Sequence, residues 1–284
     1  MLVTRTTGET RAAVSQARAR GCVIGFVPTM GALHAGHRSL VGEARRQSDF
    51  VAVSVFVNPT QFGPQEDFQE YPRTWEADRA ACEQDGVDLV FAPEVAEMYP
   101  SPGLTTVRVS GLTDRLCGAF RPGHFDGVTT VVAKLFGIVA PDRAFFGEKD
   151  FQQAVVIRRM TRDLNMPVEV VLCPTVREPD GLAMSSRNQY LTPEQRRQAP
   201  VLHAALCAAA GQVRAGRTDA AELIRGVEHR IRASGPVEID YVRIVDPLTL
   251  KDVERVECRA RLCLAVRLGS CRLIDNLAID PGAG

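Results

Sequence analysis

The sequence predicts an α/β protein: a Rossmann-like, doubly wound parallel sheet followed by a second, smaller α+β domain. Three observations predict this class. Short apolar runs alternate with helical patterns over the first 175 residues, as in parallel-sheet proteins. Glycine-containing turns follow two of the apolar runs, at the strand ends where open sheets of this kind bind ligands. The alternation then stops, and two helical patterns precede two strand-like runs.

The predicted parallel sheet has five strands, which are short apolar segments: Cys22–Val27, Val51–Val57, Asp88–Ala92, Arg143–Phe146 and Val168–Cys173. Four amphipathic helices are expected among them: His37–Gln47, Thr74–Asp85, Asp126–Val139 and Phe151–Asp163. Helices between parallel strands cover both faces of the sheet. We expect Thr74 to cap the second helix and Gly86 to end it.

A connecting segment at Pro174–Gly181 divides the chain into two expected domains, residues 1–175 and 176–284. The second domain begins with a capping box, Thr192-Pro-Glu-Gln195, which places proline at the first helical position. We expect the alanine-rich helix that follows to continue to a stop at Gly216.

One more helix and a small sheet complete this second domain. Asp219 is a candidate N-cap for the helix, which should end near Ser234-Gly235. Ile239–Val245 and Leu262–Leu268 alternate enough to be strands.

Composition limits the partners and the location. The chain has 284 residues, of which 45% are hydrophobic, and its 34 basic and 34 acidic residues cancel. No global field therefore recruits nucleic acid or a membrane surface. There is no long uncharged apolar stretch and no signal peptide at the N-terminus, so a cytoplasmic protein is expected. The eight cysteines contain no Cys-x-x-Cys pair, which favours free, buried thiols over disulfides.

The segment Gly25–Leu40 is the most informative part of the chain. A strand leads into a turn with Gly31 and Gly36, and then into a helix carrying His34 and His37, whose helical character runs from about His37 to Arg46. Free N–H groups at a helix start favour an anion, and two imidazoles can add donors to phosphate oxygens, or positive charge if a phosphate raises their pKa. Alternatively, His34 and His37 are ordinary turn and helix-start residues, or they bind zinc. Against zinc, the segment has no His-Glu-x-x-His motif and no nearby cysteine pair.

Two other loops have groups suited to a nucleotide. In Phe146–Gln153, Lys149 supplies a flexible charge at a strand end, and Asp150 can accept from ribose hydroxyls. The loop Met184–Asn188 offers two serine hydroxyls and a guanidinium, which together can clamp pyrophosphate. Taken singly, the lysine could be a surface residue and the loop a serine-rich turn.

Neutral amides are candidates for binding a small hydroxy acid. Asn58 and Gln61 follow the second strand, and Gln153 lies one turn into a helix. Amides can match both hydroxyl and carboxylate groups, although each could instead be a capping or surface residue. The polar segment Gly63–Glu70 is a candidate gate over the site, or an ordinary surface loop.

Eight motifs occur in order along nearly the whole chain: Pro28-Thr-Met-Gly-Ala-Leu-His-x-Gly-His37, Asn58-Pro-x-Gln-Phe-Gly63, Glu66-Asp67, Tyr71-Pro-Arg-Thr74, Arg121-Pro-Gly-His-Phe125, Gly147-Glu-Lys-Asp150, Gly181-Leu-Ala-Met-Ser-Ser-Arg-Asn188 and Arg272-Leu-Ile-Asp-Asn276. In these motifs the chain resembles the pantothenate synthetase family, also called pantoate–β-alanine ligases. A His-x-Gly-His motif alone also occurs in nucleotidylyltransferases and class I aminoacyl-tRNA synthetases, but eight ordered motifs are specific.

The resemblance implies two half-reactions at one site. ATP and pantoate form pantoyl adenylate and pyrophosphate, and the β-alanine amine then attacks the acyl carbon to give pantothenate and AMP. The family pattern makes His37 the proton donor, with His34 and Lys149 as further catalytic residues. Gln61 and Gln153 are expected to hold pantoate, Gln61 also to lie near β-alanine, and Asn58 to contribute to substrate binding.

The resemblance also implies an ATP site, a metal and an oligomer. The expected ATP-binding residues are Met30, Gly31, Ala32, Leu33, His34, Ala35, Gly36, His37, Gly147, Glu148, Lys149, Asp150, Val176, Met184, Ser185, Ser186 and Arg187. Mg²⁺ is expected on the ATP phosphates, without a protein ligand that the sequence identifies. A homodimer is expected.

Two other functions remain open at this point. A stand-alone nucleotidylyltransferase would use the same N-terminal site to join a phosphorylated substrate to the nucleotide. A non-catalytic nucleotide-binding regulator would not need Lys149, Gln61 and the Ser185–Arg187 loop together.

Overall fold

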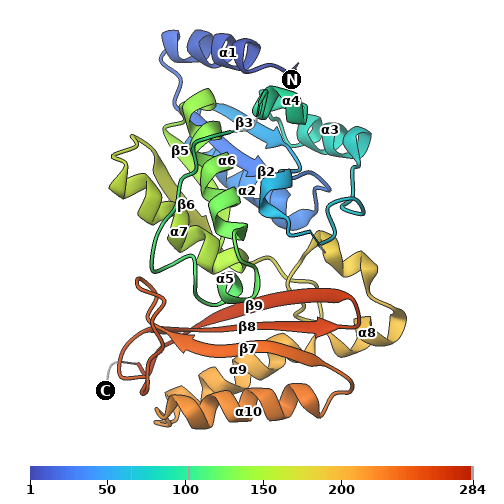
Figure 1. The fold of residues 1–284 in the computed structure, drawn as a ribbon, viewed down its shortest axis with the longest axis vertical. Helices are drawn as coiled ribbons and strands as arrows, with labels where there is room; N and C mark the ends of the chain where they lie inside the picture. Colours follow the sequence, from blue (N-terminus) through green and yellow to red (C-terminus); the bar gives the residue numbers. More distant parts are fainter. Residues whose placement is uncertain (65, 102, 283–284) are drawn as a thin grey trace.

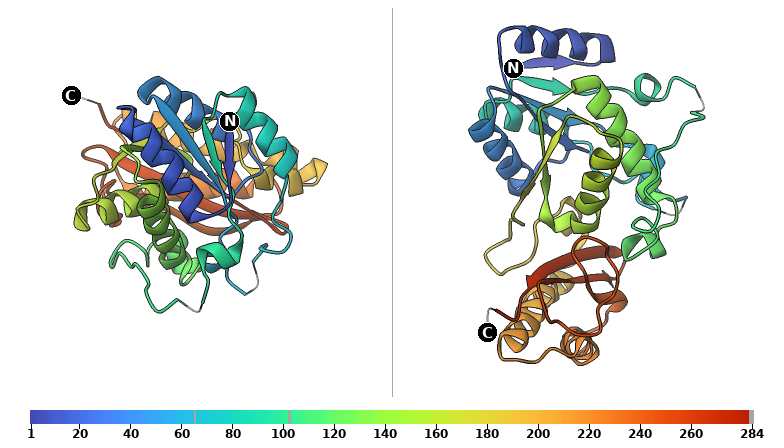
Figure 2. Two further views of the ribbon diagram at one scale, coloured as in Figure 1. Left: turned by 90° about the horizontal axis from the view of Figure 1, so that it is seen from above. Right: turned by 90° about the vertical axis from the view of Figure 1, so that its left-hand side faces the viewer.

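The computed structural model describes residues 1–64, 66–101 and 103–282. It contains a parallel sheet in the order β1-β4-β3-β2-β5-β6 and a separate antiparallel sheet in the order β7-β8-β9 (Figures 1 and 2). The parallel strands are β1 Leu2–Thr4, β2 Ile24–Thr29, β3 Phe50–Val55, β4 Leu89–Phe91, β5 Arg143–Gly147 and β6 Glu169–Cys173. These two sheets confirm the predicted fold class.

Helices cover both faces of the parallel sheet, as Figure 2 shows. The helices of this part are α1 Thr7–Ala19, α2 Ala35–Gln47, α3 Trp75–Gln84, α4 Val95–Met98, α5 Cys117–Phe120, α6 His124–Val139 and α7 Phe151–Asp163. Side chains of α1, α6 and α7 share one apolar core with the sheet, and those of α2 and α3 share another. Both faces of the central strands β2, β3 and β4 are therefore buried, which leaves the strand ends as the place for a ligand site.

The strand order places the candidate site. β2 pairs in parallel with β3 on one side and with β5 on the other. From β2 the chain first builds outward through β3 and β4, and it later returns to add β5 and β6 beyond the opposite edge of β2. The loops that leave the carboxyl ends of β2 and β5 consequently diverge and leave a crevice, which is where open parallel sheets bind ligands.

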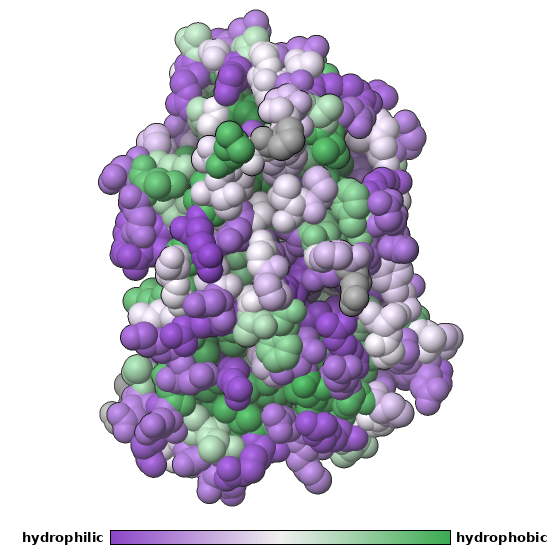
Figure 3. Space-filling model, viewed as in Figure 1, coloured by the Kyte–Doolittle hydropathy of each residue, from purple (hydrophilic) through white to green (hydrophobic). Residues whose placement is uncertain are grey.

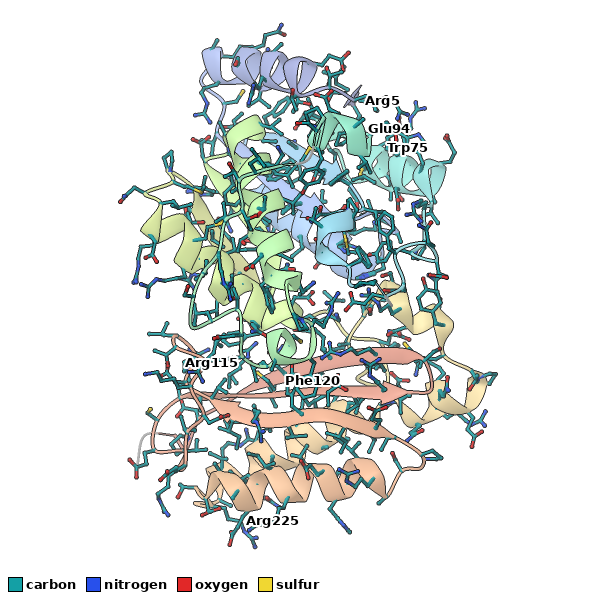
Figure 4. All side chains as sticks on the ribbon, in the orientation of Figure 1. Arg5, Trp75, Glu94, Arg115, Phe120 and Arg225 are labelled. Carbon is teal, nitrogen blue, oxygen red and sulfur yellow. The ribbon has the colours of Figure 1, made fainter. Side chains whose placement is uncertain are left out.

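The C-terminal part packs two helices on one face of the small sheet. Its elements are η3 Ser186–Tyr190, α8 Pro193–Gln198, α9 Val201–Arg214, α10 Ala220–Arg232, β7 Glu238–Val245, β8 Ala260–Leu268 and β9 Cys271–Ile279. The opposite face of this sheet meets the parallel-sheet part, where Phe120 of α5 lies 5.8 Å from Tyr241 between ring centroids (Figure 4). In Figure 3, apolar side chains gather on the lower part of the molecule, over this sheet.

Several elements differ from the prediction. The alanine-rich helix is broken into α8 and α9 at Pro200, which has no N–H group to continue the helical hydrogen bonds. Strands β1 and β9 were not predicted. Strand β1 is too short to show a periodicity, and Arg272, Asp275 and Asn276 interrupt the apolar pattern of β9. The sequence also missed α1, although Thr6 and Glu9 form a capping box there.

Only some of the helix caps predicted from the sequence are present in the structure. The Thr192 capping box and the Asp219 N-cap are both present. Thr74 occupies the N-cap position of α3 but makes no side-chain cap bond, whereas Gly86 ends that helix region with a positive φ of 72°. The division at residue 175 stays a prediction, and β6 ends two residues before it.

The structure bears on membrane-spanning helices and on the state of the cysteines. Among the described residues, no helix combines the length and the apolar character needed to cross a bilayer. All eight cysteines are free. Five are buried as expected, but Cys207 and Cys258 are exposed.

We predict that Gly127→Ala destabilises the protein by about 1–3 kcal/mol, because α6 packs directly on the backbone of η1 (Pro59–Gln61). An added Cβ would lie 2.7 Å from the backbone nitrogen of Gln61 and would collide with the carbonyl of Thr60. The measurement is the free energy of unfolding in urea. Gly137→Ala is the control, since that position in α6 is exposed and open, and the change should stabilise the helix by up to about 1 kcal/mol. Equal stability of the two variants would contradict this packing.

Candidate active site

The turn after β2 orients both histidines. Gly31 has a φ of 84°, and His34 is the N-cap of α2. Nδ1 of His34 accepts a hydrogen bond from the Gly36 N–H at 3.1 Å, and Nδ1 of His37 accepts from the His34 N–H at 3.4 Å. A ring nitrogen that accepts carries no hydrogen, so the proton of each neutral ring is on Nε2. Each imidazole therefore offers one Nε2–H donor.

Burial keeps these rings neutral near pH 7. It lowers the pKa of His37 to about 3, with a further contribution from His34. The pKa of His34 is lowered as well, first by burial and then by the charge of Lys149. The ring centroids are 4.1 Å apart, so two protonated rings would repel each other. The pair thus supplies hydrogen-bond donors in this structure, and not the positive charge that the sequence left open.

A buried carboxylate holds the histidine turn. Asp78 in α3 is 2% exposed, and its side chain accepts from the Ala32 N–H at 3.0 Å and the Leu33 N–H at 2.7 Å. A Cβ at Gly31 would lie 2.9 Å from the same carboxylate. Asp78 lies inside the helix expected over Thr74–Asp85, and no local signal in the sequence connects it with a turn 46 residues away.

The expected site residues meet around a cavity of about 230 Å³ at the β2 and β5 strand ends. Its wall includes Met30, His34, Gly36, His37, Asn58, Gln61, Gly147, Lys149, Asp150, Gln153, Val176, Met184, Ser185, Ser186 and Arg187. Five residues expected at the ATP site are not on this wall: Gly31, Ala32, Leu33, Ala35 and Glu148. A second cavity of about 770 Å³ shares Lys149, Gln153 and Arg187 with the first and extends to the C-terminal sheet.

Asn58 supports Gln61 from within the protein. The Asn58 side chain is 1% exposed, and its Nδ2 donates to Gln61 Oε1 and to the Gly127 carbonyl, both at 3.2 Å. Its Oδ1 accepts from the Tyr99 hydroxyl at 2.9 Å. The Asn58 amide is therefore engaged with protein groups, and it fixes the orientation of the Gln61 side chain.

A second set of side chains fixes the Gln61 backbone. Nδ1–H of His124 donates to the Gln61 carbonyl at 2.8 Å, and Nε2 accepts from Arg121 at 3.0 Å. Arg121 also pairs with Glu66 at 2.6 Å. Burial lowers the pKa of His124 to about 4, so the ring is neutral and keeps this tautomer. Arg121 and His124 belong to one of the eight motifs, but no role for them is predicted from the sequence.

The loop Met184–Asn188, called here the serine–arginine loop, contacts the candidate gate segment Gly63–Glu70. Arg187 forms two hydrogen bonds of 2.9 Å with Asp67 and lies over the ring of Tyr71, whose hydroxyl is 3.4 Å from Ser186 Oγ. Asp67 belongs to Gly63–Glu70, of which Gln65 lies outside the described residues. The gate segment thus reaches the cavity wall through an ion pair.

We predict that burying His37 in its neutral form makes stability fall with acid. The pKa of His37 is about 3 when folded and near 6.5 when unfolded, so the unfolded chain binds more protons below pH 6.5. This one ring should reduce the free energy of unfolding by about 2 kcal/mol between pH 8 and pH 5. Urea unfolding at both pH values measures the change.

The matching control uses an exposed histidine. His37→Gln should remove its share of that pH dependence, whereas His229→Gln in α10, whose side chain is exposed, should leave the dependence as it is. The same pH dependence in all three proteins would contradict the buried neutral ring.

Comparisons with known proteins identify the family. The family model for pantoate–β-alanine ligase matches residues 2–278. The pantothenate synthetase of Moorella thermoacetica is 57% identical over 280 residues, which cover 99% of each chain. The pantothenate synthetase crystal structure from Thermus thermophilus has a TM-score of 0.93 and 53% identity, and the match covers 98% of this chain and 99% of that one.

One similar structure was solved with ligands. It is the pantoate–β-alanine ligase of Francisella tularensis, complexed with β,γ-ATP and β-alanine. It has a TM-score of 0.83 and 33% identity, and the match covers 98% of this chain and 97% of that one. By its sequence and its fold, the chain belongs to the pantoate–β-alanine ligase family.

Proposed function

We propose that this protein condenses (R)-pantoate with β-alanine to form pantothenate, with ATP converted to AMP and pyrophosphate. Pantothenate is the precursor of coenzyme A. One observation carries the proposal: a single cavity brings the two histidine Nε2–H donors and Lys149 together with the amides of Gln61 and Gln153. Groups that suit phosphate and groups that suit a hydroxy acid therefore face the same space.

In the first half-reaction, the pantoate carboxylate attacks the α-phosphorus of ATP, and the bond to pyrophosphate breaks. Negative charge spreads over the phosphate oxygens, so positioned donors and cations supply most of the rate enhancement. His37 and His34 donate from Nε2 without first taking up a proton, and Lys149 adds a full charge. Gln61, held by Asn58 and His124, and Gln153 orient pantoate for the attack.

In the second half-reaction, the β-alanine amine attacks the acyl carbon of pantoyl adenylate, and AMP leaves. We place β-alanine near Gln61, and the larger adjoining cavity beside Gln153 and Lys149 leaves room next to it on the side of the C-terminal sheet. The Asp67–Arg187 pair joins the gate segment to the serine–arginine loop, which supports a role in keeping water from the adenylate. For Arg187 to bind ATP phosphates, it must exchange this carboxylate for them.

The donor set fits magnesium that arrives with ATP. Among the described residues there is no group of three or more His, Cys, Asp or Glu side chains arranged to hold a metal. Mg²⁺ commonly keeps several waters and binds through phosphates and one or two carboxylates. Asp150 is a half-exposed carboxylate on the cavity wall that could hold it. When bound, Mg²⁺ neutralises phosphate charge.

The remaining parts of the proposal rest on the family resemblance. We infer two domains, residues 1–175 and 176–284, which close over the ATP site, and a homodimer, which light scattering tests directly. The use of cellular ATP supports a cytoplasmic location. A monomeric mass at all concentrations would contradict the dimer.

We predict that the enzyme activates pantoate and not β-alanine, because the adenylate must form before the amine attacks. Labelled pyrophosphate should enter ATP when pantoate is present, and should not do so with β-alanine alone. AMP should accumulate over many turnovers only when both substrates are added.

Two results would contradict this order. Exchange that depends on β-alanine alone would show that the opposite partner is activated. Absence of AMP formation with both substrates would favour the nucleotide-binding regulator, and exchange that requires a phosphorylated substrate would favour a nucleotidylyltransferase.

We predict that two variants separate substrate binding from chemistry. Gln153→Ala should weaken pantoate binding by about tenfold or more and leave ATP binding almost unchanged, because it leaves a polar group of pantoate unpaired. His37→Ala should lower the rate of adenylate formation about a hundredfold or more with pantoate affinity retained, as loss of a preorganised donor does. Calorimetry and single-turnover kinetics measure the two effects. Equal weakening of ATP and pantoate in Gln153→Ala would remove its assigned role.

A further inference from the structure

We propose that Asn276 and Arg261 of the C-terminal sheet are positioning residues for Lys149. The Asn276 side chain is 4% exposed, and its Nδ2 donates to the backbone carbonyls of Glu148 at 3.0 Å and Lys149 at 2.8 Å. One amide therefore grips two successive peptide groups of the turn that carries the lysine. This inference rests on the catalytic role proposed above for Lys149.

Arg261 completes the grip on the same turn. Its Nε donates to Asn276 Oδ1 at 2.6 Å, which orients the amide with its NH₂ group toward the two carbonyls. Its Nη2 donates to the Glu148 carboxylate at 3.0 Å, and its guanidinium lies 4.4 Å from the ring centroid of Phe151. The turn Glu148–Asp150 is thus fixed from behind by two buried side chains of strands β8 and β9.

The contact explains why Glu148 is absent from the cavity wall although it belongs to the expected ATP motif. Its carboxylate turns toward Arg261, and the next residue, Lys149, lines both cavities. The ion pair on one side of the turn therefore sets the direction of the lysine on the other.

The turn that carries Lys149 joins β5 directly to α7. It is a single 3₁₀ turn, η2 (Glu148–Asp150), and no side-chain cap bond is present at its start. The Lys149 ammonium pairs at 3.7 Å with Asp150, the neighbouring residue on the same turn, so that pair moves together with the turn. A displacement of about 1 Å at a catalytic group can cost about a hundredfold in rate. The C-terminal sheet consequently supplies the fixed support that the lysine needs.

A third buried residue holds β9 in place for this contact. Asp275, next to Asn276, forms two hydrogen bonds with Arg177, at 2.7 and 2.9 Å. Arg177 lies in the segment that connects the two sheets. The strand that carries Asn276 is thus tied to the connecting segment beside the residue that grips η2.

The test measures pyrophosphate exchange in Asn276→Asp and Asn276→Ala. Asn276→Asp keeps the shape and the acceptor for Arg261, but it replaces the two N–H donors with an oxygen that faces two carbonyls. We expect kcat for exchange to fall about 10- to 100-fold in both variants, with the KM for pantoate changed less than threefold. Val266→Ala, in the core on the helix-covered side of the same sheet, is the control for lost stability and should retain kcat.

A double-mutant cycle with Lys149→Ala shows whether Asn276 acts through the lysine. If it does, Asn276→Ala should cause no further loss of kcat in the Lys149→Ala background, because the group it positions is already absent. A merely structural role would cost the same factor in both backgrounds and would overturn the proposal. A loss in Val266→Ala equal to that in the Asn276 variants would overturn it as well.

The outcomes also separate this inference from the function on which it rests. If Lys149→Ala lowers kcat and both Asn276 variants retain it, the positioning role is wrong and the lysine keeps its place in the mechanism. If Lys149→Ala itself retains kcat, the catalytic role of the lysine and the positioning role both fail.

Discussion

The site depends most on the buried Asp78 carboxylate, which accepts hydrogen bonds from two backbone N–H groups. It holds Ala32 and Leu33 in a turn that contains positive φ values at Gly31 and Ala32. Hydrogen bonds to a charged acceptor are stronger than neutral ones, and losing the acceptor would leave two donors unpaired. The same turn delivers His34 to the N-cap of α2, and that geometry in turn sets the protonated nitrogen of both rings.

A similar arrangement recurs at the other strand end of the crevice. The turn after β2 is held from α3, and the turn after β5 is held from β9 through Asn276. The amide of Gln61 is held by Asn58, and its carbonyl by His124. The histidine turn, the Lys149 turn and the Gln61 side chain are thus each supported by a buried polar residue behind them. Such support keeps reactive groups in one geometry before substrate arrives, which is the condition for electrostatic catalysis.

The sequence predicted the parts of this design that local pattern determines. The five strands, the helices between them and the residues at the ends of β2 and β5 follow from periodicity and turn chemistry. The supporting contacts could not be predicted in this way, because they join residues far apart in the chain. His124 and Gln61 are 63 residues apart, and Asn276 and Lys149 are 127 apart. The motifs containing His124 and Asn276 marked them as members of a family pattern without indicating what they contact.

Within the cavity, the Asp67 carboxylate competes with any incoming anion for the Arg187 guanidinium. Arg187 already has two charge-assisted hydrogen bonds to a carboxylate, so an incoming anion gains only the difference between its own attraction and that of Asp67. A singly charged ion of the cellular fluid gains almost nothing by displacing an equally charged partner that is tethered to the chain. A triphosphate, with several charges and other donors around it, can displace that partner. If Arg187 binds the ATP phosphates as proposed, the internal ion pair therefore sets a threshold that a small monovalent anion does not overcome and a polyanion does.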